Sequence, residues 1–233
     1  MNKSIKKSKA LYNPNIIKKT KWDFIPIIIL VLAVFFALIL ITINYLTHAY
    51  FIVKNGSMSP TLNANTHGLN DAVYVNKYAD VEVGDIAVVN GQTYSVIKRI
   101  VGCGGDKIGF VTKLNDNGEV IRKLARIPKG LNTYYELDEF YLENDKVNEY
   151  AFERFQGLIA KGEKIEFIDG IAFYAIGENE IFYVGDNRVS SFDCFNYGSV
   201  DKQCLIGKVE VIVKEQRFFL LQYLLYTLGI KKV

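Results

Sequence analysis

The sequence predicts a mostly β domain with a barrel-like sheet, interrupted by a smaller inserted lobe. It also predicts one N-terminal transmembrane helix and a short C-terminal apolar helix. Three observations carry this prediction. Residues 24–53 contain no Asp, Glu, Lys or Arg, the following chain breaks into short runs rich in Val, Ile and Tyr, and an acidic, aromatic stretch separates two groups of these runs.

The apolar segment is long enough to cross a bilayer as a helix over residues 24–46. A cleavable secretory signal is the alternative, but its apolar core normally has about 7–15 residues, and this one is longer. Residues 1–23 form a basic tail with seven lysines. Basic residues beside one end of a membrane span favour the cytoplasm for that end, which predicts a single-pass protein with its large domain outside.

Charge and cysteine content narrow the function. Seven of the 28 basic residues lie in the tail, which leaves 21 basic residues against 25 acidic residues in the rest of the chain. A nucleic-acid-binding domain would carry a basic excess, so this class of function is disfavoured. The sequence leaves two possibilities for the cysteines, a Cys194–Cys204 disulfide bridge or free thiols. Cys103 makes the number of cysteines odd. No spacing of Cys or His indicates a metal site, and no cofactor is expected.

Nine runs are predicted as strands, since apolar residues alternate along them or fill them, and Gly, Asn and Asp mark the turns between them. They divide into a first part of the core at 47–111, an inserted lobe at 112–165 with a helix near 149–160, and a second part at 166–214. Residues 215–233 carry an apolar run too short to span, predicted as an interfacial helix or as a helix packed on the domain. The predicted strands are 71–78, 84–91, 93–102, 107–114, 118–124, 164–170, 171–177, 180–186 and 207–214.

The segment "NGSMSPTL", residues 55–62, offers Ser57 as a turn residue or as a nucleophile. A serine needs a positioned base to attack a carbonyl group. His48 lies at the end of the predicted anchor and His67 in a predicted polar loop. A Ser-His-Asp triad therefore lacks a convincing histidine.

Lys98 is the better candidate for the base. In "YSVIKRIVG", strand alternation places Lys98 on the same face as Tyr94, Val96 and Ile100. Burial among apolar neighbours lowers a lysine pKa and supplies the neutral amine that a base requires. The competing interpretation is that Lys98 extends its charge to the surface, as lysines commonly do.

A third segment, "GDNRVSSFDCFNYG" at 185–198, follows a strongly β run and gathers many polar residues. Together with "NGSMSPTL" and "VIKRIVGCGGDKIG" (96–109), it resembles the bacterial type I signal peptidases, or leader peptidases, a family of membrane-anchored serine proteases with a Ser-Lys dyad. "GDIAVV" and "FYLENDKVNEYAF" stand in the expected order. The resemblance covers about residues 24–213.

The resemblance implies that Ser57 is the nucleophile and Lys98 the general base. It implies that the Ser57 N–H and the Asn55 side chain meet the oxyanion, and that the Ser191 hydroxyl helps to hold the lysine. Asp193 matches an aspartate that stiffens the site with a nearby arginine. The other residues carried over in supporting roles are Arg99, Met58, Gly185, Asp186 and Asn187.

Four positions depart from the family pattern. Asn55 stands where a serine is frequent, although an amide can also donate to an oxyanion. Cys194 and Phe195 replace Ser-Arg, so Asp193 lacks the adjacent arginine and is expected to depend on Arg99. Gly104 stands where proline is common.

The predicted function is cleavage of signal peptides from translocated preproteins after small residues, at the outer face of the bacterial cell membrane. The expected partners are secretory preproteins and the phospholipid bilayer, with the protein translocation machinery as a further candidate and no nucleic acid. One alternative is a Ser-Lys peptidase dedicated to a single secretion, pilus or conjugation substrate. The other is an inactive membrane-anchored binding protein. A Cys194 protease would need a base that the sequence does not offer.

Overall fold

The computed structural model describes residues 22, 24–63, 70–91, 93–142 and 144–216. Contacts within the chain divide it into two units between Leu46 and Thr47. The predicted basic tail, apart from Trp22, and the C-terminal run from residue 217 onward lie outside the described residues, as does His67.

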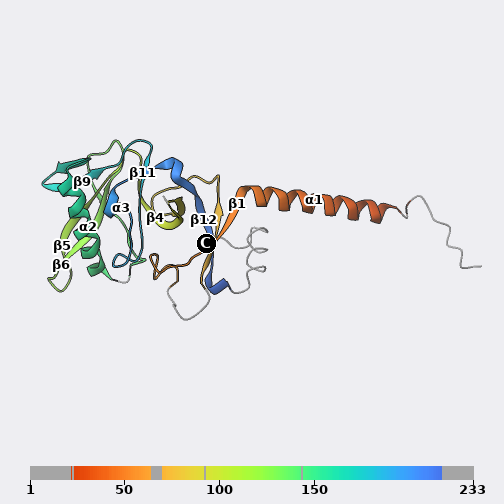
Figure 1. Ribbon diagram of the computed structural model, residues 1–233, viewed down its shortest axis with the longest axis horizontal. Coiled ribbons are helices and arrows are strands. Elements are labelled where there is room, and N and C mark those ends of the chain that lie inside the picture. The colour runs from red at the N-terminus through yellow and green to blue at the C-terminus, as the bar shows by residue number, and fades with distance from the viewer. Residues whose placement is uncertain (1–21, 23, 64–69, 92, 143, 217–233) are drawn as a thin grey trace, which may run out of the picture. The chain divides into compact units, whose positions relative to one another are not determined.

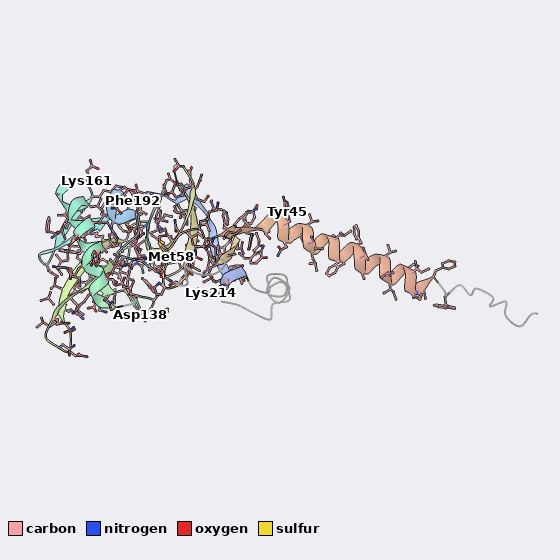
Figure 2. All side chains as sticks on the ribbon, turned by 60° about the horizontal axis from the view of Figure 1, so that its bottom comes forward. Tyr45, Met58, Asp138, Lys161, Phe192 and Lys214 are labelled. Atoms are coloured by element: carbon pink, nitrogen blue, oxygen red, sulfur yellow. The ribbon has the colours of Figure 1, made fainter. Side chains whose placement is uncertain are left out.

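The first unit is the helix α1, Ile25–Thr47, which continues by one residue into the second unit. Its 23 residues include no buried one, and its side chains project on all sides of the helix (Figure 2). At 1.5 Å per residue the helix is about 35 Å long, slightly more than the ~30 Å hydrocarbon core of a bilayer. By length and composition it could span a membrane, as the sequence predicted.

The second unit contains two antiparallel sheets, and β strands dominate it (Figure 1). The seven-stranded sheet has the order β1-β2-β12-β3-β4-β10-β11. The last strand among the described residues, β12, therefore lies inside the sheet, between β2 and β3. The strands are β1 His48–Ile52, β2 Ala72–Asn76, β3 Ile86–Asn90, β4 Ser95–Cys103, β10 Glu180–Val184, β11 Val200–Asp201 and β12 Leu205–Val213.

The five-stranded sheet has the order β7-β6-β5-β9-β8 and draws on residues 107–175. Its strands therefore come partly from the predicted lobe 112–165 and partly from the residues that flank it on both sides. Figure 1 shows β5, β6 and β9 gathered beside α2, at a distance along the domain from β1 and β12. The strands are β5 Lys107–Leu114, β6 Val120–Ile127, β7 Tyr135–Glu136, β8 Ile165–Ile168 and β9 Ile171–Ala175.

One long helix and several single turns complete this unit. The helix α2, Asn148–Lys161, buries an apolar face that includes Ala151, Phe155 and Leu158, and it ends at Gly162 in the left-handed conformation that favours glycine. This helix confirms the one predicted near 149–160. The short elements are η1 Asp145–Val147, α3 Cys194–Tyr197, η2 Lys202–Cys204 and η3 Lys214–Gln216.

All nine predicted strands are present, because alternation and turn residues identify strands that bury one or both faces. The mostly β fold class is thus confirmed. The sequence did not predict β1, β7 and β11, and the small helix α3 was also missed. Two of these strands have only two residues, and β1 follows directly on α1 without a turn signal.

Candidate active site

Ser57 lies in the loop between β1 and β2, held by contacts within the loop and to the start of β2. The Ser59 N–H donates to the Gly56 carbonyl at 3.0 Å, and the Leu62 N–H donates to the Met58 carbonyl at 2.8 Å. Met58 and Leu62 are fully buried, and Figure 2 shows Met58 inside the body of the domain. These apolar anchors fix the backbone on the C-terminal side of Ser57.

Lys98 lies in β4, opposite Ala87 of β3, and its amine meets the Ser57 hydroxyl. The Lys98 Nζ donates to the Ser57 Oγ at 2.6 Å, across 41 positions of sequence. Lys98 is only 3 % exposed, so it does not extend to the surface. Burial lowers the Lys98 pKa, while the carboxylates of Asp193 and Asp186 act in the opposite direction. The structure thus pairs a hydroxyl with an amine that loses its proton more readily than an ordinary lysine.

The last signature segment holds the Ser57 loop in place. The Asn187 N–H donates to the Ser57 carbonyl at 3.1 Å, and the Asn187 Nδ2 donates to the Gly56 carbonyl at 3.0 Å. A Cβ on Gly185 would lie 2.4 Å from the Ser57 carbonyl oxygen and 2.2 Å from the Ser191 Oγ. Only glycine permits this close approach of the two loops.

Replacement of Gly185 with Ala is expected to lower turnover by more than tenfold, because the added methyl must push the Ser57 carbonyl away from its position beside Lys98. Steady-state cleavage of a fluorogenic peptide would measure this effect. Gly157→Ala, at an exposed position of α2 with no atom within 4 Å of the added Cβ, is the matched control for a general cost of replacing glycine. Equal rates for Gly185→Ala and wild type would show that the loops have room to adjust.

Arg99 points away from Lys98 and pairs with Asp186. Its Nε and Nη2 donate to the two Asp186 carboxylate oxygens at 2.8 and 2.6 Å, and Thr61 donates to the same carboxylate at 2.6 Å. The ring of Tyr141 lies under the guanidinium, 3.9 Å from its carbon to the ring centroid. Asp186 therefore connects β4 to the Ser57 loop.

Asp193 is completely buried and accepts two backbone N–H groups, from Gly185 at 2.9 Å and from Phe195 at 3.2 Å. The expectation that Asp193 depends on Arg99 is wrong, since Arg99 is taken by Asp186. The cation near Asp193 is instead Arg154 of α2, with Nη2 3.9 Å from the Asp193 Oδ2. Sequence reasoning missed Arg154, because nothing in the sequence brings position 154 beside position 193.

Two predicted side chains lie at the site in orientations that differ from the expected ones. The Asn55 carbonyl oxygen, not its NH₂ group, faces Ser57: the Ser57 Oγ donates to the Asn55 Oδ1 at 3.1 Å, with the Ser57 N–H 3.5 Å away. The Ser191 Oγ is buried against Gly185 and has no hydrogen-bond partner within the described part of the chain. The predicted bond from Ser191 to the lysine is therefore not formed in this structure.

The departures from the family pattern have local packing reasons. Phe195 is fully buried and packs against Phe110, Phe155 and Phe182, where a guanidinium would be costly. At Gly104 a Cβ would lie 1.9 Å from the Glu178 carbonyl oxygen, which also excludes proline.

The cysteines do not provide a bridge or a second nucleophile among the described residues. Cys103, Cys194 and Cys204 are free thiols, so the Cys194–Cys204 bridge is not formed. The Cys194 sulfur accepts the Tyr183 N–H at 3.3 Å, and burial raises the pKa of this thiol well above its usual value. His48 is not positioned as a base for Ser57, because its Nε2 lies beside the Glu210 carboxylate, 3.4 Å from the Oε2.

A cleft of about 280 Å³ opens beside the Ser57–Lys98 pair. One wall is the chain from Ile52 to Met58, and the other is the start of β4 from Tyr94 to Lys98. There, β4 pairs with β3 on one side only, because its pairing with β10 begins at Arg99. An extended peptide can therefore bind along the unpaired edge and present its carbonyl group to Ser57.

Comparison with known proteins gives consistent results. Residues 23–214 match the family model described as signal peptidase, peptidase S26. The chain is 25 % identical to the signal peptidase I of Buchnera aphidicola subsp. Baizongia pistaciae (strain Bp), over 90 % of this chain and 80 % of that protein. It is 29 % identical to signal peptidase I S of Bacillus subtilis (strain 168), over 72 % of this chain and 75 % of the other. A crystal structure of a signal peptidase I from Enterococcus faecalis V583 aligns with a TM-score of 0.32 and 18 % identity, covering 56 % of this chain and 97 % of that one.

Proposed function

This chain belongs to the signal peptidase family, peptidase S26, and we propose that it is a membrane-anchored endopeptidase that removes signal peptides with a Ser57–Lys98 dyad. The observation that carries the proposal is the 2.6 Å contact between the Lys98 Nζ and the Ser57 Oγ, with both side chains buried. Ser57 and Lys98 both line the cleft beside the unpaired edge of β4. A base within hydrogen-bond reach of a serine hydroxyl is what covalent catalysis by serine requires.

The reaction begins with the neutral Lys98 amine. It takes the Ser57 proton as the Oγ attacks the carbonyl carbon of the scissile bond, and a tetrahedral oxyanion forms. The Ser57 N–H is the first oxyanion donor. We propose that the Asn55 amide turns by about 180° when substrate binds and supplies its NH₂ group as the second oxyanion donor. A second donor further stabilises the negative charge of the tetrahedral intermediate.

Collapse of the tetrahedral intermediate breaks the peptide bond. The Lys98 ammonium gives its proton to the leaving amine, and the acyl group stays on Ser57. Water then attacks the acyl-enzyme, with Lys98 again accepting a proton, and the carboxylate product leaves as Ser57 is regenerated. Asp186, Asn187 and Gly185 support the site by holding β4 and the Ser57 loop. Asp193 supports it by accepting the Gly185 N–H, and Ser191 by packing against Gly185.

The substrate and the cellular setting follow from the family and from α1. Signal peptides carry small residues before the cleavage point, and the narrow cleft is compatible with small side chains. The apolar α1 supports anchoring in the cell membrane, with the N-terminal side in the cytoplasm and residues 47–214 outside. Preproteins delivered to that face, and the bilayer itself, are the proposed partners.

Cleavage of preproteins tests the proposal directly. The full chain in detergent is expected to cut a signal-bearing preprotein after a small residue, as N-terminal sequencing of the product would show. The rate is expected to rise with pH and level off below the usual lysine pKa, since burial lowers the pKa of Lys98 and only the neutral amine acts as base. Intact general preproteins would favour a dedicated substrate or a binding role, and a rate that does not change with pH would exclude Lys98 as the base.

A further inference from the structure

The Asp193 carboxylate is a buried negative charge behind the reacting groups. It is 0 % exposed, and each of its oxygens accepts one backbone N–H. Such bonds favour the ionised carboxylate. A buried charge remains costly unless an opposite charge lies near it, so the neighbouring cation is an essential part of this environment.

That cation is Arg154, from the middle of α2. Its Nη2 lies 3.9 Å from the Asp193 Oδ2, and its Nη1 donates to the Arg188 carbonyl at 2.9 Å. The Arg154 Nε and Nη2 are buried without a hydrogen-bond partner among the described residues. Burial of the Arg154 guanidinium therefore costs free energy, because two of its nitrogen atoms are removed from water without gaining a hydrogen bond in the described part of the chain. The attraction of Asp193 offsets part of that cost.

We propose that Arg154 is a positioning residue for the Ser57–Lys98 pair, which acts from α2 by balancing the Asp193 charge and by holding the loop after β10 at the Arg188 carbonyl. The proposal rests on the proposed function of that pair. It gives the region 112–165 a role in catalysis without contact to the substrate. It also explains how the site accommodates an aromatic residue at position 195, since the positive charge comes from another element.

Arg154 affects the Lys98 pKa through Asp193. Asp193 is the strongest influence that raises the Lys98 pKa against burial. Loss of Arg154 removes one of the positive charges that act on Asp193, so the Asp193 carboxylate stabilises the Lys98 ammonium more strongly and the Lys98 pKa rises. The charged and titratable groups that act on Lys98 or Asp193 are Tyr183 on β10, Asp186 and Arg188 in the following loop, Cys194 and Tyr197 on α3, and Arg154 on α2.

The test compares pH profiles of kcat for wild type, Arg154→Met and Arg154→Lys. For Arg154→Met, the midpoint of the rise with pH is expected to move up by about half to one unit. Cleavage at neutral pH then falls about 3- to 10-fold and recovers at high pH. Arg154→Lys keeps the charge and is expected to restore most of the wild-type midpoint. Lys161→Met removes an exposed charge from the end of the same helix (Figure 2), where the Nζ donates to the Asn196 carbonyl only at 3.4 Å, and is the control with an unchanged profile.

Two outcomes overturn the proposal. An Arg154→Met midpoint equal to that of wild type would show that the charge does not reach the dyad. A uniform loss of rate at all pH values, not restored by Arg154→Lys, would assign Arg154 to stability alone. Arg154→Gln, which can still donate to the Arg188 carbonyl, replaces Arg154→Met if the latter does not fold.

A readout without turnover separates this proposal from the proposed function. The Lys98 titration can be followed by NMR of labelled lysine, with its resonance assigned by loss in Lys98→Met. Arg154→Met is expected to raise that titration midpoint even if no preprotein is cleaved. Absence of cleavage by wild type would therefore contradict the peptidase function, whereas an unshifted titration would contradict the role of Arg154.

Discussion

Ser57→Ala and Lys98→Met are each expected to lower the rate of preprotein cleavage by about 10⁴-fold or more, since groups that act as a unit lose nearly all their effect when one is removed. Ser57→Ala removes the attacking oxygen, and Lys98→Met keeps the apolar stem but removes the only amine within 2.6 Å of that oxygen in the described structure. Cleavage of a radiolabelled preprotein over several hours would measure losses of this size.

Controls for these two variants come from the same region. Ser190→Ala changes an exposed serine of the same signature, and Lys161→Met changes an exposed lysine. Both are expected to retain wild-type rates, which would exclude a general effect of the substitutions. If Lys98→Met keeps more than a tenth of the wild-type rate, another group accepts the Ser57 proton and the base has been misassigned.

Arg188→Met is expected to lower the free energy of unfolding by about 3–5 kcal/mol, the usual cost of leaving one member of a buried ion pair alone. The Arg188 side chain is 0 % exposed, and its Nη2 lies 2.6 Å from the Glu139 Oε1, itself only 2 % exposed. Asn148 bonds the second carboxylate oxygen at 2.7 Å, so the pair joins the last signature to the start of α2. Loss of the cation leaves the Glu139 charge buried with this amide as its partner.

Urea unfolding followed by far-UV circular dichroism measures this loss. The single tryptophan, Trp22, precedes α1 and would not report on the β domain. The double variant Arg188→Met/Glu139→Leu is expected to recover most of the lost stability, because no charge is left unpaired. Lys129→Met, which breaks an exposed pair with Glu178, is the control and should cost less than about 1 kcal/mol. A loss below about 1 kcal/mol for Arg188→Met would show that water reaches Glu139.

The sequence was informative wherever a local pattern determines the outcome. Alternation predicted the strands and placed Lys98 on an apolar face, although on this strand alone its extension to the surface was the favoured alternative, and the ordered motifs predicted Ser57 and Lys98 as partners. The ion pairs were not predictable: Arg99 could have served Asp193 or Asp186, and the choice depends on which side of β4 each carboxylate occupies. Arg154 and Glu139 reach their partners only through the packing of α2 and its preceding loop, which no spacing along the chain reveals.

The position of β12 inside the sheet also connects the two segments that carry Ser57 and Lys98. In the seven-stranded sheet, β1 and β2 lie on one side of β12 and carry the Ser57 loop between them, while β3 and β4 lie on the other side and carry Lys98. Ser57 and Lys98 are thus joined through β12, the last strand among the described residues. A chain that lacks residues 205–213 would hold these two side chains on separate pieces of sheet. We therefore expect the loss of this one strand to abolish the activity proposed for the pair, although neither residue lies on it.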